Sequence, residues 1–401
     1  MSSVTRRLAM LIPAVVLVLA QAPGDSVSLS AALARARATR GQAIVAAAQV
    51  AEARAALRSA GAISNPTASF SHSGAVPQEH FLFDQPLDFL LRRGPERSAA
   101  RARITGAQAD STQTIAGLVR EVRTTFYGAL AAGISERLVA AQSLYADSVA
   151  ALAAARFKAG DISLLEQEQA AQEAARARQA FSVARQAAQV ADAAFARAIA
   201  WGEARAPHAA GSLDADLAEP RTDSLISDSL PVVRAAVADS AATAALARSA
   251  AASRIPLPTI QGGAEWGDPT QPGTLGVVGL AVPLPLWQSG GGPVAEARAR
   301  ARRAAALAGE TRLEAARALS ELRARLTETG QRARFARDSM LPGAALLRAR
   351  AVHAYQAGET GILPVLDALR SEREVGLAAI QDQLAFQEAL ADWSALLGRA
   401  E

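Results

Sequence analysis

Few residues in this chain could carry out chemistry. It has four histidines and no cysteine, which excludes disulfides and Cys-ligated zinc. His72, His80, Asp84 and Asp88 lie close together in the sequence, and imidazole and carboxylate groups can jointly bind a cation. The interpretation that we favour is that they are polar residues of a β-hairpin. No Ser-His-Asp set can be assembled, so we predict no metal site and no catalytic residue.

A glycine-rich segment and the charge balance also fail to indicate a ligand. Residues 290–293, Gly-Gly-Gly-Pro, could cradle a phosphate, but they lack the lysine and the Ser or Thr of a P-loop. They fit a turn from a strand into a helix. The formal charge is +4, Lys158 is the single lysine, and the arginines are spread among alanines without interleaved aromatics. We therefore predict no enzyme, no cofactor and no nucleic-acid partner.

The predicted helices and strands of the chain are organised by an internal repeat. Residues 157–165, Phe-Lys-Ala-Gly-Asp-Ile-Ser-Leu-Leu, return 198 positions later as residues 355–363, Tyr-Gln-Ala-Gly-Glu-Thr-Gly-Ile-Leu. Both copies lie between long alanine-rich segments. Glycine just past a helix adopts the left-handed conformation at little cost, and an acid then lies near the start of the next helix. Each copy is therefore predicted to be the turn of a helical hairpin, and the chain to be two copies of one unit.

The N-terminus has the pattern of a secretory signal. Arg6 and Arg7 precede an apolar run of about 13 residues, shorter than the ~20 that span a membrane as a helix. An uncleaved anchor is the alternative, and no later stretch is judged to reach that length. The predicted domains are a signal peptide (1–20), a first repeat (21–205), a linker (206–231) and a second repeat (232–401). The mature chain would be exported, so strands would have to cross any membrane.

Each repeat is predicted to contain a helix, two strands and a helical hairpin. One helix is expected from Ser30 to about Ala60, and Pro95 is expected in the first turn of the long helix that follows. Apolar residues, mostly alanine, recur at a spacing of three and four along the hairpins, as in closely packed coiled coils. The predicted strands cover about 67–73, 80–90, 259–266 and 275–286, and the hairpins cover 95–200 and 293–398.

The strands have the composition of a membrane β-barrel. Val278, Leu280, Val282 and Leu284 alternate with other residues and would share one lipid-facing side. Aromatic residues at strand ends are typical of the lipid–water interface; the candidates are Phe70, Phe81, Phe83, Trp266 and Trp287. Four strands cannot close a barrel, and an open edge is not tolerated in lipid. The chain is therefore expected to share a barrel with copies of itself.

These features together resemble the TolC family of outer-membrane efflux proteins over the whole mature length. The matching segments are residues 29–33 (Leu-Ser-Ala-Ala-Leu), 65–67 (Asn-Pro-Thr), 282–286 (Val-Pro-Leu-Pro-Leu) and the two Gly-acid turns. The modest length is most similar to the CzcC-like heavy-metal branch. The resemblance implies a mainly helical protein with a membrane β-barrel part: a homotrimer with a twelve-stranded barrel in outer-membrane lipid and an α-helical tunnel through the periplasm.

The resemblance also implies partners and site residues. The tips around Gly160, Asp161, Gly358 and Glu359 would dock a periplasmic adaptor protein that connects to an inner-membrane pump. Asp367 matches one of the two aspartates of the family's periplasmic gate, with Arg370 beside it, and Pro364 replaces the other. A ring of carboxylates would favour cations. The alternative for Asp367 is an acid stabilised by the helix dipole.

The predicted function is the exit duct of a tripartite efflux system. A component of type I protein secretion and a pore-less periplasmic coiled coil are the alternatives. An adaptor would instead have one hairpin flanked by compact β domains. Metal ions, drugs and polypeptides all remain open as substrates.

Overall fold

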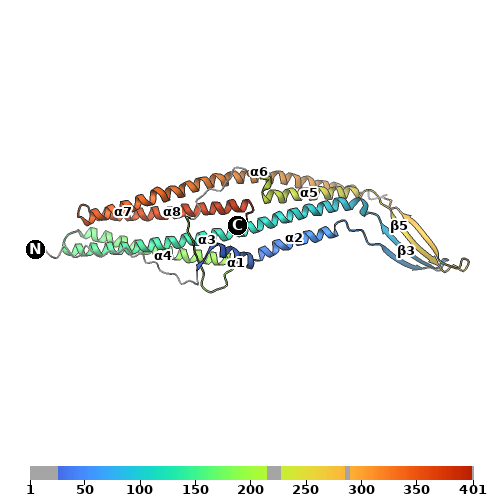
Figure 1. Cartoon of the computed structure of the whole chain (residues 1–401), viewed down its shortest axis with the longest axis horizontal. Helices are drawn as coiled ribbons and strands as arrows, with labels where there is room; N and C mark the ends of the chain where they lie inside the picture. Colours follow the sequence, from blue (N-terminus) through green and yellow to red (C-terminus); the bar gives the residue numbers. More distant parts are fainter. Residues whose placement is uncertain (1–25, 215–226, 285–289, 400–401) are drawn as a thin grey trace.

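The computed structural model describes residues 26–214, 227–284 and 290–399. It is a long rod with a β-sheet at one end and the turns of two helical hairpins at the other (Figure 1). The predicted signal peptide, Trp287 and the middle of the predicted linker lie outside the described residues. The rod shape follows from helices that are mostly alanine on their contact faces, since small side chains let helices approach closely but build no thick core.

The two halves of the chain follow the same order. The first half contains α1 (Leu29–Thr39), α2 (Gly41–Ser59), β2 (Thr67–His72), β3 (Glu79–Pro86), α3 (Phe89–Ala159) and α4 (Leu164–Ala198). The second contains α5 (Pro231–Ala252), β5 (Thr259–Trp266), β6 (Leu275–Ala281), α6 (Gly291–Phe335), a π-helical turn (Ala336–Met340), α7 (Leu341–Gln356) and α8 (Leu363–Leu396). This duplication is the one that the repeated turn predicts.

The opening helix is divided, which corrects the prediction of one helix from Ser30 to Ala60. Ser28 caps α1, and Arg40 between α1 and α2 has an extended backbone. The Arg40 side chain bonds both the Arg197 carbonyl, at 3.2 Å, and Glu121, at 3.1 Å. The break therefore depends on contacts with distant segments, which local helix propensity does not record.

Two prolines lie where the long helices depart from the prediction. Helix α3 begins at Phe89, so Pro95 is inside it rather than in its first turn. In the second half Pro342 lies in the first turn of α7, just after the π-helical turn that separates α6 from α7. Proline removes one backbone donor from a helix. Each long helix here accommodates one proline. In α3 the proline lies near the start of the helix, and between α6 and α7 it follows the π-helical turn.

The helices pack along the predicted apolar stripes. Phe126 of α3 and Phe195 of α4 meet edge to face with ring centroids 5.5 Å apart. Buried positions on α3 that match the predicted stripe are Leu118, Val122, Ala129, Val139, Ser143, Ala146 and Ala153. One 18-residue window of α3 has a mean hydropathy of 1.4 and passes as a membrane span by length and composition alone. This corrects the expectation that no stretch after the N-terminus reaches that length.

A short parallel pair of strands holds the segment after α4. Strand β1 (Ser26–Val27) pairs with β4 (His208–Ala209) beside α3 and α4. The Nδ1 atom of His208 lies 2.8 Å from Oδ2 of Asp192 on α4. Burial raises the pKa of the Asp192 carboxyl, and the nearby His208 opposes this shift. These contacts attach the start of the linker to the middle of the rod.

The four remaining strands form one antiparallel sheet in the order β2-β3-β5-β6. Each half contributes a hairpin, and the pairing of β3 with β5 joins the halves. The register places Phe70 beside Phe81, and Gly262 between Phe83 and Val278. Strand β3 ends at Pro86 and β6 at Ala281, earlier than the predicted residues 90 and 286. No other described strand pairs with the outer edges of β2 and β6.

Candidate functional site

The sheet has one mainly apolar face and one mainly polar face. Successive residues of a strand point to opposite faces, so the register assigns every side chain. Val278, in the middle of β6, is 89% exposed, although valine is normally a core residue. One face carries Ala68, Phe70, Phe81, Phe83, Ile260, Ala264, Trp266, Val278 and Leu280, with the polar His72, Glu79 and Gln85 near the strand ends. The opposite face carries Ser69, Ser71, His80, Asp84, Gln261 and Glu265, with the apolar Leu82, Leu275 and Val277 among them. This is the alternation expected of a lipid-exposed barrel strand.

The predicted interface aromatics lie on the apolar face. Phe70, Phe81 and Phe83 are exposed there, and the ring of Trp266, at the end of β5, is 6.1 Å from that of Phe70. Trp287 is outside the described residues. An exposed aromatic group of this size is unusual for a protein surface in water. It indicates that this face is covered in the working protein.

The hypothesised cation site does not form. His80 pairs with Glu265 at 3.1 Å on the polar face, whereas His72 pairs with Glu79 at 2.9 Å on the other face. Asp84 accepts a hydrogen bond from Gln261 at 2.8 Å. Among the described residues no group of three potential metal ligands is found. Asp88 binds Ser64 and Arg92 instead, so the four residues have separate partners and do not converge on one point.

The two hairpin turns have similar backbones but different caps. Gly160 and Gly358 have φ values of 81° and 78°, the left-handed region that glycine adopts without strain. Beyond the first turn, Ser163 and Glu166 form a capping box at the start of α4. Helix α8 has no side-chain cap and begins with Pro364 in its first turn. Asp161 and Glu359, the predicted docking residues, are exposed beside their glycines.

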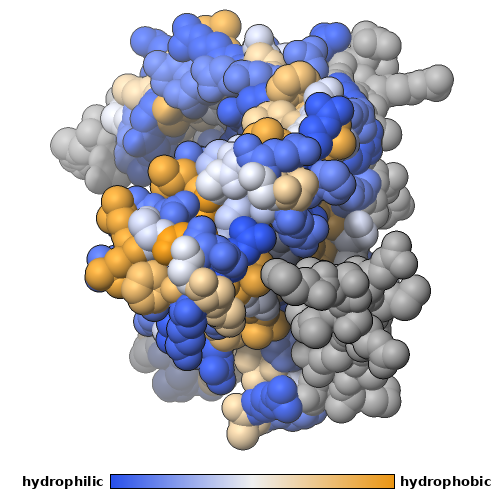
Figure 2. Space-filling model, turned by 90° about the vertical axis from the view of Figure 1, so that its left-hand side faces the viewer, coloured by the Kyte–Doolittle hydropathy of each residue, from blue (hydrophilic) through white to orange (hydrophobic). Residues whose placement is uncertain are grey.

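Apolar side chains surround these acids at the tips. Leu164, Leu165 and Leu363 begin the returning helices and are at least half exposed. The view onto the tip end shows orange, apolar side chains gathered on one side of it among hydrophilic neighbours (Figure 2). An exposed apolar patch rimmed by polar residues is typical of a surface that another protein covers. This places the candidate docking residues in a chemically suitable setting.

A buried carboxylate that the sequence analysis missed joins the two hairpins near the tips. Glu173 of α4 is only 3% exposed. Arg370 of α8 donates to Glu173 Oε2 from Nε at 2.9 Å and from Nη2 at 2.8 Å, and Arg373 Nη1 is 3.7 Å from Oε1. The hydrogen bond with Glu173 raises the pKa of Arg370. We call Glu173, Arg370, Arg373 and Asp367 the tip cluster.

Asp367, the gate candidate from the resemblance, lies at the edge of the tip cluster. Its side chain is 70% exposed and accepts one hydrogen bond from Arg370 Nη1 at 3.1 Å. Such an exposed pair within one helix contributes little to stability. The stronger link between hairpins is therefore made by Glu173. An acid inside the alanine stripe of α4, next to Ala174, is the signal that could have identified it.

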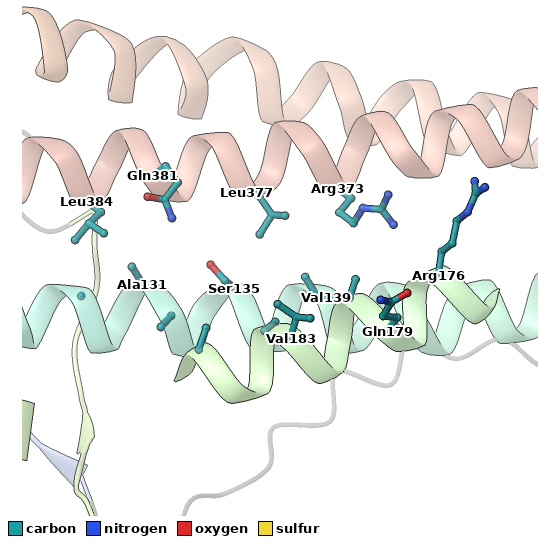
Figure 3. A pocket seen from close by; sticks show the side chains of 15 residues that line it. Ala131, Ser135, Val139, Arg176, Gln179, Val183, Arg373, Leu377, Gln381 and Leu384 are labelled. Atoms are coloured by element: carbon teal, nitrogen blue, oxygen red, sulfur yellow. The ribbon is translucent and has the colours of Figure 1, made fainter. Parts of the chain in front are cut away.

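Next to the tip cluster the hairpins separate. A groove of about 640 Å³ opens between α4 and α8, with α3 as its floor. Leu377, Gln381 and Leu384 of α8 face Ala131 and Val183 across it (Figure 3). Arg373 lies at one end of the groove, where it contacts Glu173. Helix α8 is thus tied to α4 through polar groups at the tip and is free of it along the groove.

Comparisons with known proteins give a consistent result at the level of structure. No family model matches the sequence, and no curated protein matches it. Three solved structures that it resembles are the outer membrane protein VceC from Vibrio cholerae, the transmembrane channel CusC, and the MtrE outer membrane channel from Neisseria gonorrhoeae.

The likeness covers nearly all of each chain. VceC is 18% identical with a TM-score of 0.72, over 93% of this chain and 97% of VceC. For CusC the identity is 16%, the TM-score 0.75 and the coverage 92% of both chains. For MtrE the identity is 17% and the TM-score 0.71, over 93% of this chain and 89% of MtrE. The chain therefore has the TolC-like fold predicted from its sequence, the fold of these outer-membrane channels.

Proposed function

We propose that the chain is the outer-membrane exit duct of a tripartite efflux system. In this proposal three copies form a pore in the outer membrane, and an inner-membrane pump and a periplasmic adaptor deliver the substrate. The observation that carries the proposal is the sheet, which has one exposed, mainly apolar face and two outer edges that no strand in the described ranges pairs with. Such a sheet is unfavourable in water and in lipid alone, and closure with copies of itself removes both problems.

The strand order supports closure. The strands alternate in direction across β2-β3-β5-β6, so the two edge strands β2 and β6 run in opposite directions. Strand β6 of one copy can therefore pair antiparallel with β2 of the next, and the alternation continues around the ring. Three copies give twelve strands, with Val278 and the aromatic residues facing lipid. The number three comes from the family resemblance.

The helical wall supports the same arrangement. Helices α2 and α4 lie along one side of the rod, and α6 and α7 along the other (Figure 1). Both sides carry exposed apolar residues: Ile44, Val45, Val183 and Val190 on the first, and Leu307, Leu313, Phe335 and Leu346 on the second. A head-to-tail contact between these unlike sides produces a closed ring when the rotation closes. The ring would continue the pore as a tunnel through the periplasm.

The tip cluster is the proposed gate. Opening the lower end requires α8 to move away from α4, and the bonds from Arg370 and Arg373 to Glu173 resist that movement. Adaptor contact at Gly160, Asp161, Gly358 and Glu359 would favour the open state by binding it more tightly, because a partner shifts an equilibrium only through differential affinity. Asp367 supplies a smaller, solvent-exposed part of the restraint.

The proposal is tested by purification from outer membranes, mass measurement in detergent and recording in planar lipid bilayers. We expect a trimer that migrates differently before and after heating and that forms discrete conducting channels. A water-soluble monomer without conductance would refute the proposal and would favour the pore-less coiled coil.

A further inference from the structure

Arginines are concentrated where the helices meet the sheet. Four segments flank the strands, and together they hold thirteen arginines and four acidic residues, a surplus of nine positive charges. These segments are residues 50–66, 87–104, 245–258 and 290–304. The formal charge of the whole chain is only +4. The excess is therefore local, and it lies immediately below the apolar face of the sheet.

Three of these arginines converge on one pocket. It has a volume of about 340 Å³ and is formed by the end of α2, the turn toward β2 and the first turns of α3. Arg58, Arg93 and Arg97 line it together with the apolar Leu57 and Ile63. We call it the arginine pocket. Its basic and apolar lining suits a ligand with a negative charge and a hydrocarbon part.

The backbone turn that forms the pocket is specific. Gly61 has φ +66°, and a Cβ atom there would lie 2.5 Å from Cγ of Arg93. Any other residue at this position would be strained and would displace Arg93. The glycine therefore allows α3 to approach the turn closely enough for Arg93 to face Arg58.

The positive charge of the pocket is not neutralised by the described part of the chain. No described carboxylate lies within ion-pair distance of Arg58, Arg93 or Arg97. The nearby acids have other partners, since Asp88 and Glu96 both bind Arg92. The Nε atom of Arg97 is buried without a hydrogen-bond acceptor. A buried charged donor without an acceptor is costly, so an anion in the pocket would stabilise it.

A neighbouring copy would not supply the anion. The opposite side of the rod at this height is the start of α6, which carries Arg298, Arg302 and Arg303. Its one acid, Glu296, binds Arg300 at 2.5 Å. Contact between copies would add positive charge to the region.

Resting on the proposed placement in the outer membrane, we propose that the arginine pocket binds the phosphate of an anionic phospholipid in the periplasmic leaflet. Strand β2 begins at Thr67, only four residues after Ile63, so the pocket lies at head-group depth below the apolar face. Ile63 and Leu90 are more than half exposed at this level and can contact acyl chains. Arginine binds phosphate oxygens in a bidentate manner that lysine cannot reproduce.

The test measures phosphatidylglycerol bound to the detergent-solubilised protein by native mass spectrometry, with phosphatidylcholine and inorganic phosphate as competitors. A single change, Arg93→Gln, is expected to weaken phosphatidylglycerol binding about fivefold, and Arg58→Gln, Arg93→Gln and Arg97→Gln together about 100-fold. Replacement of the same three residues by Lys keeps the charge and should give a smaller loss. The control is a triple variant that removes the same number of positive charges at sites away from the sheet. It combines Arg37→Gln, Arg185→Gln and Arg350→Gln.

Bilayer conductance of the same samples separates this inference from the proposed function. Loss of phosphatidylglycerol binding with conductance retained supports the pocket. Unchanged lipid binding in the triple Gln variant, equal loss in the control, or displacement of the lipid by millimolar inorganic phosphate would overturn it, even if the channel conducts. Absence of conductance from the unmodified protein would count against the channel proposal instead.

Discussion

The two ends of the rod are held by different kinds of interaction. The sheet exposes valine, leucine and aromatic side chains, and no described strand pairs with its two outer edges, so in the proposed duct it is completed by lipid and further copies. The tip end buries its own apolar cluster, around Tyr355, Ile362 and Leu366, and adds glycine turns, a capping box and the hydrogen bonds of Glu173. The apolar face of the sheet needs a cover from outside the chain, whereas the hydrogen bonds of Glu173 at the tips can exchange with water or with a partner. In the proposed duct, this difference makes the sheet the fixed end and the tips the movable end.

The largest effect is expected from a charge on the apolar face of the sheet. Val278→Arg places a guanidinium near the middle of the lipid-facing band, where it costs about 2–4 kcal/mol per subunit. We expect the trimer to be largely lost from the outer-membrane fraction on unheated gels. Val277→Arg is the matched control, because the adjacent residue points to the polar face. Equal assembly of both variants would contradict the assignment of the faces.

The next effect is expected at the tip cluster. Glu173→Ala leaves Arg370 and Arg373 without their shared partner, and because both arginines retain some access to water we expect a cost of about 1–3 kcal/mol. Single-channel conductance or antibiotic leakage should rise while the trimer persists. Glu168→Ala, an exposed acid on the same helix, should change neither. Loss of the trimer instead of leakage would mean that this end is as permanent as the sheet.

A smaller change of the same sign is expected from Asp367→Ala. The Asp367 side chain is exposed and, among the residues that the structure describes, binds only Arg370, so its removal should cost less than about 1 kcal/mol. Conductance should therefore rise less than in Glu173→Ala. A larger rise from Asp367→Ala would show that an acidic ring, and not the link between hairpins, controls opening. If neither variant changes the conductance, the gate does not lie in this region.

The smallest effect is local to the first turn. Ser163→Ala removes the capping box of α4 and should cost about 1 kcal/mol. Faster amide hydrogen exchange is expected in the first turn of α4, with no change in trimer stability. Ser182→Ala, in the exposed middle of the same helix, is the control. If exchange at the first turn is unaffected, the cap does not hold this tip.

The sequence predicted the features that depend on local pattern. The Gly-acid turns at Gly160 and Gly358, the alternation around Val278 and the alanine stripes of the hairpins each follow from backbone or side-chain periodicity. The features it did not predict depend on tertiary contacts. The break at Arg40 is fixed by Glu121 and Arg197, residues far away in the sequence.

The candidate sites divide in the same way. Asp367 was identified by resemblance, but Glu173, which also binds Arg370, lies on the other hairpin, 197 positions before Arg370. The arginine pocket likewise combines α2 with α3 through a turn, so no single segment predicts it. In both cases the charged residues were visible in the sequence, and only the fold showed which of them meet.

The central claim, that β2 and β6 of neighbouring copies close the barrel, can be tested directly by disulfide cross-linking. The chain has no cysteine, so Ser69→Cys can be combined with Val277→Cys or Gly279→Cys without background. All three positions lie on the polar face of the edge strands. Oxidation of outer membranes should produce covalently linked subunits up to a trimer for at least one pair. Monomers alone from both pairs, with protein present in the outer membrane, would contradict the account.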